Sequence, residues 1–247
     1  MRLERVTITG ADDKINPEDI ISISKMFPFV EWGILFSPSR QGTPRYPSFD
    51  WINRLKEKTD VSHAILRFSA HFCGDYTKEI IETGDNKLIG ENNCIKEFGH
   101  MFNRVQLNFN ATKHTISDEF YDFIKRDARV KIIIQSNKAN RDVCAEIIKR
   151  QIPVHFLWDS SGGRGIANDN EWSVPFFNHF TGYAGGLTPD NLEGKLSKFF
   201  KFIFGDETDI WIDAESGVRT DDNLDMDKVV KFLEIASEYT EHSKHTE

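Results

Sequence analysis

Three short turns rich in small residues contain the groups of this 247-residue chain whose types and spacing could hold an anion. The turns are 159–165 (Asp-Ser-Ser-Gly-Gly-Arg-Gly), 184–189 (Ala-Gly-Gly-Leu-Thr-Pro) and 213–218 (Asp-Ala-Glu-Ser-Gly-Val). Glycines leave backbone N–H groups uncovered, as phosphate binding at a strand-to-helix turn requires. A spacing of roughly 25–30 residues is typical of consecutive β–α units of one barrel around one ligand. The candidate phosphate-binding residues are Gly163, Gly165, Gly185, Gly186, Ser216 and Gly217. Glycines also make tight turns that bind nothing, and this alternative stays open.

Two carboxylates begin the first and third of these turns. Asp159 and Asp213 each end a strand-like run, which is where barrel folds place general acids and bases. Asp159 could instead cap a helix or order its loop, and Asp213 could anchor neighbouring side chains. His71 and Cys73, at the end of an earlier run, are further candidate proton carriers. A structural role for His71 and a metal site with two ligands are the alternatives there, and the sequence supplies no evident third and fourth ligand.

Three other polar residues are candidates for binding a substrate. Arg45 lies in the loop 37–47, after the second strand-like run, and its guanidinium could clamp a carboxylate through a bidentate pair. A solvated loop charge is the alternative for Arg45. Gln106 and Asn108 alternate with apolar residues in a later strand-like run, which places them on its polar face.

Short β-like runs alternate with helix-like runs along the chain, the pattern of βα units around a parallel sheet. Strands are predicted near 5–9, 31–36, 64–71, 104–110, 130–135, 154–159, 180–184 and 209–214. Helices are predicted near 17–27, 48–58, 75–83, 116–128, 140–150, 188–203 and 225–240, with only a weak signal in unit six. The length matches the ~250 residues of an eight-unit barrel. The sequence thus predicts the α/β class and a single (β/α)8 TIM-barrel domain over 1–247. Its active site is expected at the C-terminal ends of the strands. An insertion is also predicted near residues 84–100.

Alternation within the predicted strands separates an outer face from an inner one. In 64–71, Phe68 and Ala70 share the apolar face, and Ser69 and His71 share the other. Barrel strands bury one face under helices and send the other into the lumen. Three further strands send inward Gln106, Asn108, Asn110, His155, Leu157, Asp159, Trp211, Asp213 and Glu215. Buried polar groups are costly unless one another, water or a ligand satisfies them, so the inner face is predicted to be a working site.

Composition argues against several other kinds of protein. The formal net charge of −8 argues against nucleic acid or an anionic membrane as the main partner. No run approaches about 18 apolar residues and the N-terminus has no apolar signal core, which predicts a cytoplasmic protein. Cys73, Cys94 and Cys144 have neither zinc-ribbon nor CxxC spacing, so free thiols are expected. No cofactor and no metal are predicted.

Several segments resemble phosphoribosylanthranilate isomerases, which are phosphate-binding TIM barrels of tryptophan biosynthesis. The segment 157–165 is similar to that family's Leu-Asp-Ser…Gly-Gly-Thr-Gly turn, and Trp172 lies near the place of its Phe-Asp-Trp. The segments 184–189 and 213–218 are similar to its Ala-Gly-Gly-Leu-Thr-Pro and Asp-x-x-Ser-Gly-Val. The resemblance runs through most of the barrel and is specific mainly in the C-terminal half.

Two earlier segments extend the resemblance. The segments 105–107 and 43–46 are similar to the family's Val-Gln-Leu-His strand and Ser-Pro-Arg loop. The resemblance implies that Asp159 is the general acid and that Arg45 contacts the carboxylate of an anthranilate group. It also implies that the late glycines form a phosphate site.

The chain departs from the family pattern at the residues that transfer protons. The family's first strand reads Lys-Ile-Cys-Gly with the cysteine as general base, whereas this chain has Thr7 and Thr9 in place of the lysine and the cysteine. An alcohol ionises many pKa units above a thiol and cannot accept a proton unaided. Asn108 replaces the family's histidine, and Arg219 replaces the glutamate after Ser-Gly-Val.

The leading hypothesis is therefore a divergent phosphoribosylanthranilate isomerase-like barrel, monomeric or homodimeric, that acts on a phosphorylated sugar or similar small anion. Asp159 would be the acid, with His71, Cys73 or Asp213 as the base. One alternative is a catalytically inactive barrel that only binds its ligand. Another is a metal-dependent lyase or hydrolase in which His71, His155, Asp159 and Asp213 converge on an ion.

Overall fold

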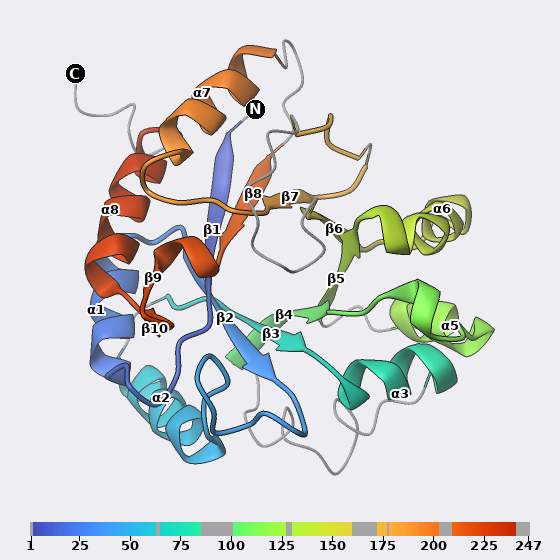
Figure 1. Ribbon diagram of the computed structural model, residues 1–247, viewed down its shortest axis with the longest axis horizontal. Coiled ribbons are helices and arrows are strands. Elements are labelled where there is room, and N and C mark those ends of the chain that lie inside the picture. Colours follow the sequence, from blue (N-terminus) through green and yellow to red (C-terminus); the bar gives the residue numbers. More distant parts are fainter. Residues whose placement is uncertain are drawn as a thin grey trace.

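Eight parallel strands close into a barrel in the order of the chain (Figure 1). The computed structural model describes residues 2–62, 65–84, 101–126, 130–159, 172–176, 178–202 and 209–240. The strands are β1 (Leu3–Thr9), β2 (Val30–Phe36), β3 (Phe68–Phe72), β4 (Phe102–Leu107), β5 (Lys131–Ser136), β6 (His155–Asp159), β7 (Thr181–Ala184) and β8 (Ile210–Ala214). β8 pairs with β1 and closes the ring, with Thr7 opposite Asp213. The predicted (β/α)8 TIM-barrel fold is confirmed.

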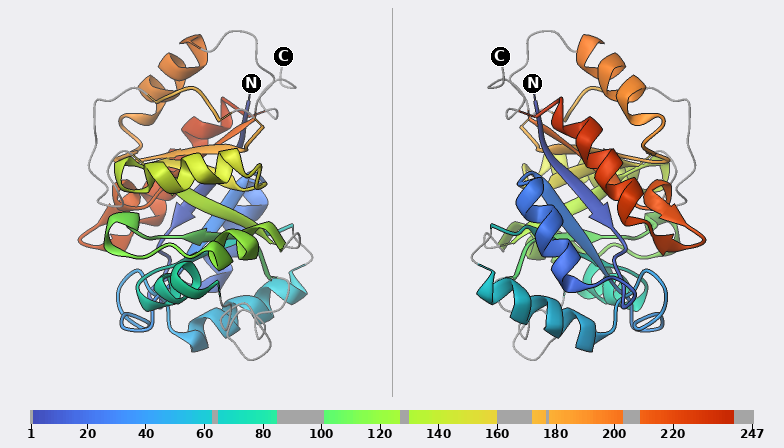
Figure 2. Two further views of the ribbon diagram at one scale, coloured as in Figure 1. Left: turned by 90° about the vertical axis from the view of Figure 1, so that its right-hand side faces the viewer. Right: turned by 90° about the vertical axis from the view of Figure 1, so that its left-hand side faces the viewer.

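Helices surround the barrel, as the two side views show (Figure 2). They are α1 (Pro17–Met26), α2 (Phe49–Val61), α3 (Asp75–Thr83), α5 (Asp118–Arg126), α6 (Arg141–Lys149), α7 (Leu192–Phe202) and α8 (Met226–Ser237). Local start signals fix several of them. The side chain of Asn16 accepts a hydrogen bond from the backbone N–H of Glu18 before Pro17 opens α1. Asp225 caps α8 in the same way. None of the described helices is long and apolar enough to cross a membrane.

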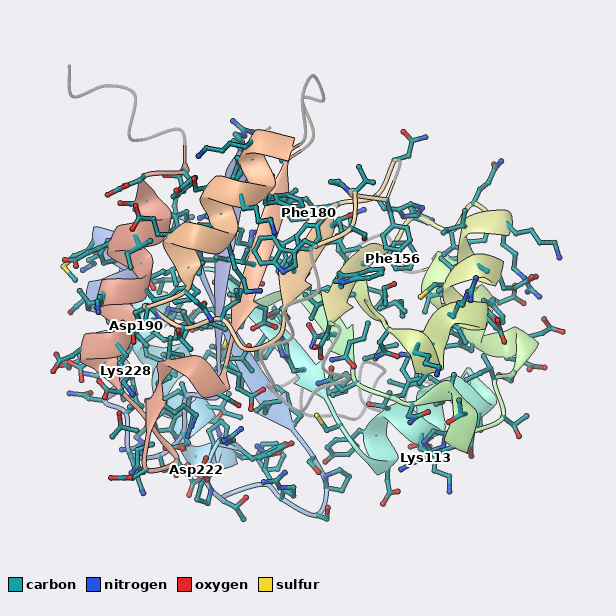
Figure 3. All side chains as sticks on the ribbon, turned by 45° about the horizontal axis from the view of Figure 1, so that its top comes forward. Lys113, Phe156, Phe180, Asp190, Asp222 and Lys228 are labelled. Atoms are coloured by element: carbon teal, nitrogen blue, oxygen red, sulfur yellow. The ribbon has the colours of Figure 1, made fainter. Side chains whose placement is uncertain are left out.

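Two separate apolar clusters confirm the predicted alternation of the strands. The large cluster lies between strands and helices and includes Phe68, Ala70 and Phe156. The small cluster consists of Ile133, Leu157 and Trp211, with Phe180 packed against it inside the barrel. Figure 3 shows the ring of Phe180 directed toward the interior, whereas Lys113 lies at the outer edge. Apart from this small cluster, the inner faces carry buried polar residues such as Ser69, His71 and Gln106.

A buried ion pair forms the floor of the lumen, toward the N-terminal ends of the strands. Arg104 of β4 reaches Glu31 of β2, with its Nε 3.0 Å from Glu31 Oε2, and both side chains are almost completely buried. Its guanidinium carbon lies 4.1 Å above the ring of Trp211. Burial alone would raise the pKa of Glu31, but Arg104 and then Arg5 outweigh it and lower the pKa to about 2. This pair and its partners fill the lumen near the N-terminal ends of the strands. The open space for a site therefore lies at the carboxyl ends.

A few predicted boundaries differ from the structure. The fourth strand ends at Leu107, and the side chain of Asn110 then accepts a hydrogen bond from the N–H of Thr112 in a short 3-10 turn. Between β6 and β7 the described residues 172–176 and 178–180 contain no helix, in keeping with the weak signal there. The predicted insertion, apart from Gly84, lies outside the described residues, and so does Cys94. Cys73 and Cys144 are free thiols.

Candidate active site

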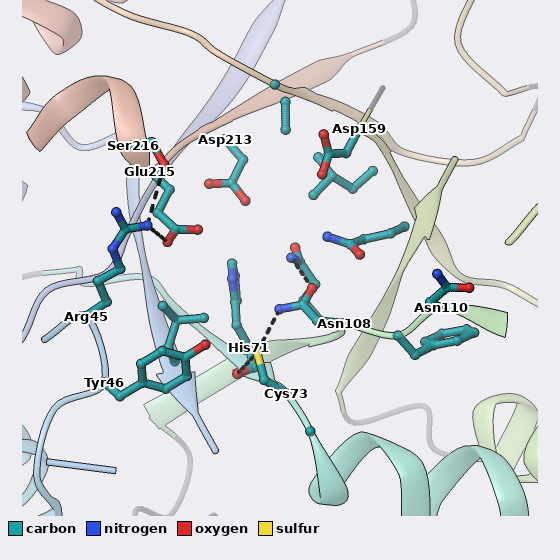
Figure 4. Close-up of a pocket in the computed structure, with 18 of the residues that line it drawn as sticks. Arg45, Tyr46, His71, Cys73, Asn108, Asn110, Asp159, Asp213, Glu215 and Ser216 are labelled. Carbon is teal, nitrogen blue, oxygen red and sulfur yellow. Dashed lines mark hydrogen bonds and ion pairs between the residues drawn. The ribbon is translucent and has the colours of Figure 1, made fainter. Parts of the chain in front are cut away.

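A cavity of about 660 Å³ opens at the carboxyl ends of the strands (Figure 4). It brings together eleven of the thirteen candidate site residues from the sequence. They are Arg45, His71, Cys73, Gln106, Asn108, Asp159, Gly185, Gly186, Asp213, Ser216 and Gly217. The other two, Gly163 and Gly165, lie outside the described residues. Tyr46, Glu215 and Asp222 also line the cavity. The sequence placed Glu215 on the inner face of its strand without assigning it a role, and it did not single out Tyr46 or Asp222 as site residues.

Asp159 and Asp213 point into this cavity from β6 and β8 (Figure 4). Asp213 is buried, and its Oδ1 accepts a hydrogen bond from Thr9 Oγ1 at 2.8 Å. Burial raises the pKa of Asp213 to about 8, and the nearby carboxylates of Glu215 and Asp159 add to this, while the hydrogen bond from Thr9 lowers it. Asp213 is therefore mostly protonated at neutral pH. Two carboxyl groups with different environments in one cavity form an arrangement that can support acid–base chemistry.

His71 and Cys73 stand beside this pair at the end of β3, and both are held uncharged. Burial lowers the pKa of His71 to about 3, and Ser69 Oγ lies 3.0 Å from its Nε2. A neutral imidazole with so low a pKa is a weak proton acceptor. Burial also raises the pKa of the Cys73 thiol, although hydrogen bonds from Asn108 and Tyr46 act in the opposite direction. The geometry therefore favours the two carboxyl groups as the proton carriers, and the roles of His71 and Cys73 stay predictions.

A short polar chain crosses from β4 to β3. Gln106 Nε2 donates to Asn108 Oδ1 at 2.8 Å, and Asn108 Nδ2 donates to Cys73 Sγ at 3.3 Å. Asn108 occupies the place of the histidine in the resembled family, and here its amide links two strands. The other amide atom of Gln106, Oε1, is buried and has no hydrogen-bond partner among the described residues.

Arg45 lies at the wall of the cavity, where acidic side chains surround it. Its Nη1 donates to Glu215 Oε1 at 2.8 Å, and its Nη2 lies 2.6 Å from Asp222 Oδ1. Its backbone has a positive φ of 74° and its N–H donates to Asp12 Oδ2 at 2.8 Å, which fixes the loop. The predicted contact with a ligand carboxylate would have to compete with these two carboxylates. Glu215 and Asp222 lie 170 and 177 residues beyond Arg45 in the chain. Nothing in the sequence predicted that they would pair with it.

The late glycines bring two loops into contact at the rim. A Cβ added to Gly217 would stand 1.8 Å from the carbonyl oxygen of Leu187, so only glycine fits this approach. Gly185 and Gly186 have positive φ values of 105° and 65°. Asn191 Nδ2 donates to the carbonyl of Gly186 at 2.8 Å and holds this turn in place. The two turns therefore pack tightly against each other. Their backbone also lines the cavity, which is a requirement for binding an anion through N–H groups.

The metal alternative finds no support in the described geometry. Within the described ranges no group of three or more His, Cys, Asp or Glu side chains is placed to hold a metal ion. His155, one of the four proposed ligands, lies on the floor of the lumen with Nδ1 3.5 Å from Arg104 Nη1. Burial and the neighbouring Arg104 lower its pKa to about 3.

The fold and the site define a class of protein, the (β/α)8 barrels with a polar cavity at the carboxyl ends of their strands. The sequence model of the family described as N-(5'phosphoribosyl)anthranilate (PRA) isomerase matches residues 100–235, more than half of the chain. The chain belongs to this family. No curated protein sequence is significantly similar to it.

Solved structures of this family share the fold. The phosphoribosyl anthranilate isomerase of Thermotoga maritima is 18% identical, with a TM-score of 0.57 over 95% of this chain and 99% of that one. The enzyme from Thermus thermophilus is also 18% identical, with a TM-score of 0.59 over 94% and 98% of the two chains. A third structure, 19% identical with a TM-score of 0.60 over 95% and 99%, is a complex with reduced 1-(o-carboxyphenylamino)-1-deoxyribulose 5-phosphate.

Proposed function

We propose that this protein binds a phosphorylated sugar and isomerises it by moving a proton next to a carbonyl or imine carbon. The observation that carries the proposal is the pair of Asp159 and Asp213, which face one cavity at the carboxyl ends of β6 and β8. Membership of the PRA isomerase family supports an isomerase-type reaction. The solved relative with a bound deoxyribulose 5-phosphate derivative supports a phosphorylated sugar as the ligand class.

The turns at 184–189 and 213–218 would hold the phosphate through their backbone N–H groups. Gly185, Gly186 and Gly217 let the backbone line the cavity at these turns. The sugar would then extend across the cavity between the two carboxyl groups. Binding through the phosphate orients the carbon that loses a proton, and orientation of this kind supplies a large part of enzymatic rate enhancement.

The two carboxyl groups divide the proton transfers between them. Asp213, protonated at neutral pH, would donate its proton to the oxygen or nitrogen of the double-bonded group. Asp159 would take the proton from the neighbouring carbon, which leaves a neutral enol or enamine. Asp159 then gives its proton to the former carbonyl or imine carbon, and Asp213 takes the proton of the hydroxyl on the carbon that was deprotonated, so that a new carbonyl forms there. Both carboxyl groups thereby regain their starting states. The sequence and the resemblance favour Asp159 as the acid, whereas the raised pKa of Asp213 favours this reversed assignment.

Thr9 takes a supporting part in this scheme. The threonine occupies the place of the family's cysteine, and its hydroxyl donates to Asp213 Oδ1. It therefore orients Asp213 and tunes its pKa rather than accepting a proton itself. The oligomeric state, monomer or homodimer, and the cytoplasmic location stay predictions.

The experiment measures ligand binding and proton exchange separately. Thermal stabilisation by ribose 5-phosphate, ribulose 5-phosphate and inorganic phosphate reports binding in wild type, Ser216→Asp and Ser22→Asp. The aspartate at 216 adds a negative charge to the phosphate turn, whereas exposed Ser22 in α1 is a matched control away from the cavity. Stabilisation in wild type and the control but not in Ser216→Asp is expected. No stabilisation by any phosphate would contradict the phosphate site.

Proton exchange tests the chemistry. Incorporation of deuterium from D2O into a bound sugar phosphate, followed by NMR, is expected in wild type and is expected to be lost in Asp159→Asn. That variant should still bind the ligand, because the phosphate turns are intact. Binding without exchange in wild type would instead identify the inactive, ligand-binding barrel.

A further inference from the structure

Arg45 is already paired with carboxylates of its own chain. Glu215 Oε1 lies 2.8 Å from Nη1, and Asp222 Oδ1 lies 2.6 Å from Nη2 and 2.7 Å from Nε. Figure 4 shows the carboxylate of Glu215 between Arg45 and the open space of the cavity. Bidentate and charge-assisted bonds of this kind are the strong ones, so a ligand carboxylate would have to displace one of these partners. The residue that would attract a carboxylate is therefore occupied.

The charges of the cavity also disfavour a ligand carboxylate. Among the described lining residues, carboxyl groups outnumber cationic groups. With Asp213 protonated, the charged carboxylates are Asp75, Asp159, Glu215 and Asp222, and the cations are Arg40, Arg45 and Lys78. Arg40 lies over the ring of Tyr46 with its Cζ 4.4 Å from the centroid, which engages a second cation of the wall. A ligand carboxylate in addition to a phosphate would meet net repulsion here, whereas a cationic group would be attracted.

A second and independent observation concerns Gln106. Its side chain lines the cavity and the residue is only 3% exposed. Nε2 is bonded to Asn108, but Oε1 has no partner in the described part of the chain. A buried acceptor without a donor costs free energy, and a ligand that brings an N–H would satisfy it. The cavity therefore lacks a donor at this position.

We propose that the preferred ligand is a phosphorylated sugar whose substituent carries a cationic nitrogen, such as a primary ammonium, in place of a carboxylate, and that Glu215 sets this preference. The inference rests on the proposed phosphate-binding function and adds the chemical class of the group at the other end of the ligand. An ammonium has three donors and no acceptor, so it suits a wall that offers the carboxylate of Glu215 and the unpartnered Gln106 Oε1. A carboxylate has acceptors only and would face like groups.

The test compares two ligands that differ in one group. The first is reduced 1-(o-carboxyphenylamino)-1-deoxyribulose 5-phosphate, and the second is the same compound with an aminomethyl group in place of the carboxyl. Calorimetry at pH 7 gives Kd for each, with inorganic phosphate as the reference anion. Wild type is expected to bind the aminomethyl compound at least ~10-fold more tightly, a ratio within the range that charge complementarity produces.

Two variants then assign the preference. Glu215→Gln keeps the shape of the side chain but removes the charge that holds Arg45, and it is expected to reduce the ratio of the two Kd values ~10-fold. Asp222→Asn is the matched control, since its side chain is more than half exposed and is expected to change the ratio less.

The outcomes separate the two proposals. If wild type binds the carboxyl compound as tightly as the aminomethyl compound, the inference is overturned while the phosphate-binding function stands. An unchanged ratio in Glu215→Gln overturns the role of Glu215. If neither compound nor inorganic phosphate binds to wild type, the proposed function itself fails. The comparison in wild type needs no variant, so it decides the ligand class even if Glu215→Gln does not fold.

Discussion

Replacing Asp213 with asparagine is expected to stabilise the protein and to abolish the proposed isomerisation. Burial raises the pKa of Asp213 to about 8 in the folded chain. In the unfolded chain the same carboxyl is exposed and titrates near its usual pKa of about 3.9. Folding at neutral pH must therefore take up a proton at this residue, and this uptake opposes folding. Asparagine has the shape of the protonated acid and keeps an oxygen for the hydrogen bond from Thr9, so the variant folds without the proton.

The magnitude follows from proton linkage. Each pH unit between the two pKa values changes the free energy of unfolding by ~1.4 kcal/mol. At pH 7, roughly three units above the unfolded pKa, the variant is expected to be more stable by about 4 kcal/mol. The folded pKa is the raised one, so the stability is fully present below the unfolded pKa and is lost as the pH rises to about 8. The advantage of Asp213→Asn should grow from pH 5 to pH 7 and level off above about pH 8.

Urea denaturation of both proteins at pH 5, 6, 7 and 8 measures this advantage. Other titrating groups are common to both proteins, so they cancel in the difference. Thr9→Val removes the hydrogen bond that lowers the pKa of Asp213, and the levelling-off is expected to move to higher pH. An advantage that stays constant between pH 5 and pH 7, or a variant less stable than wild type at pH 8, would refute the reasoning.

Two further substitutions test the loop packing and the floor of the lumen. Gly217→Ala would place a Cβ 1.8 Å from a carbonyl oxygen of the neighbouring loop, so thermal melting should show clear destabilisation and phosphate should bind more weakly. Gly194→Ala in α7 is the control, because a Cβ added there would meet no atom within 4 Å. It is expected to raise the free energy of unfolding by about 0.5–1 kcal/mol. Equal changes in stability for the two variants would contradict the packing argument. Arg104→Met leaves Glu31 buried without its main partner, and a loss of about 3–5 kcal/mol is expected in urea denaturation. The double variant Arg104→Met/Glu31→Leu should lose much less, and an equal loss would show that packing rather than the unpaired charge is responsible.

Much of the fold could be predicted because its signals are local. Period-two alternation separates Phe68 and Ala70 from Ser69 and His71 without reference to the rest of the chain, and the structure confirms the two faces. Cap residues such as Asn16 mark the start of a helix within three positions of it. These patterns place each element, and the rules of parallel sheets then assemble them into a barrel.

The candidate site was predicted in part for a similar reason. In a parallel barrel all strands end at the same rim, so a carboxylate or a glycine turn at the end of any strand must face the others. That rule was enough to gather Asp159, Asp213 and three of the glycines, Gly185, Gly186 and Gly217, into one cavity. It could not reveal Glu215 as the partner of Arg45, because the two residues are 170 positions apart and lie in different loops, and no local pattern shows which loop charges meet.

The sequence by itself determined the order of the strands and helices, which strand faces are polar and which residues stand at the rim. The tertiary structure alone decided the pairings between those residues and their protonation. Thr9 meets Asp213 across 204 positions because β8 closes against β1, and Arg104 meets Glu31 across 73 because both point into the same lumen. Burial sets the pKa of Asp213 and His71, and burial depends on every strand of the closed ring. Local patterns fix where a side chain points, whereas long-range closure fixes what it meets there.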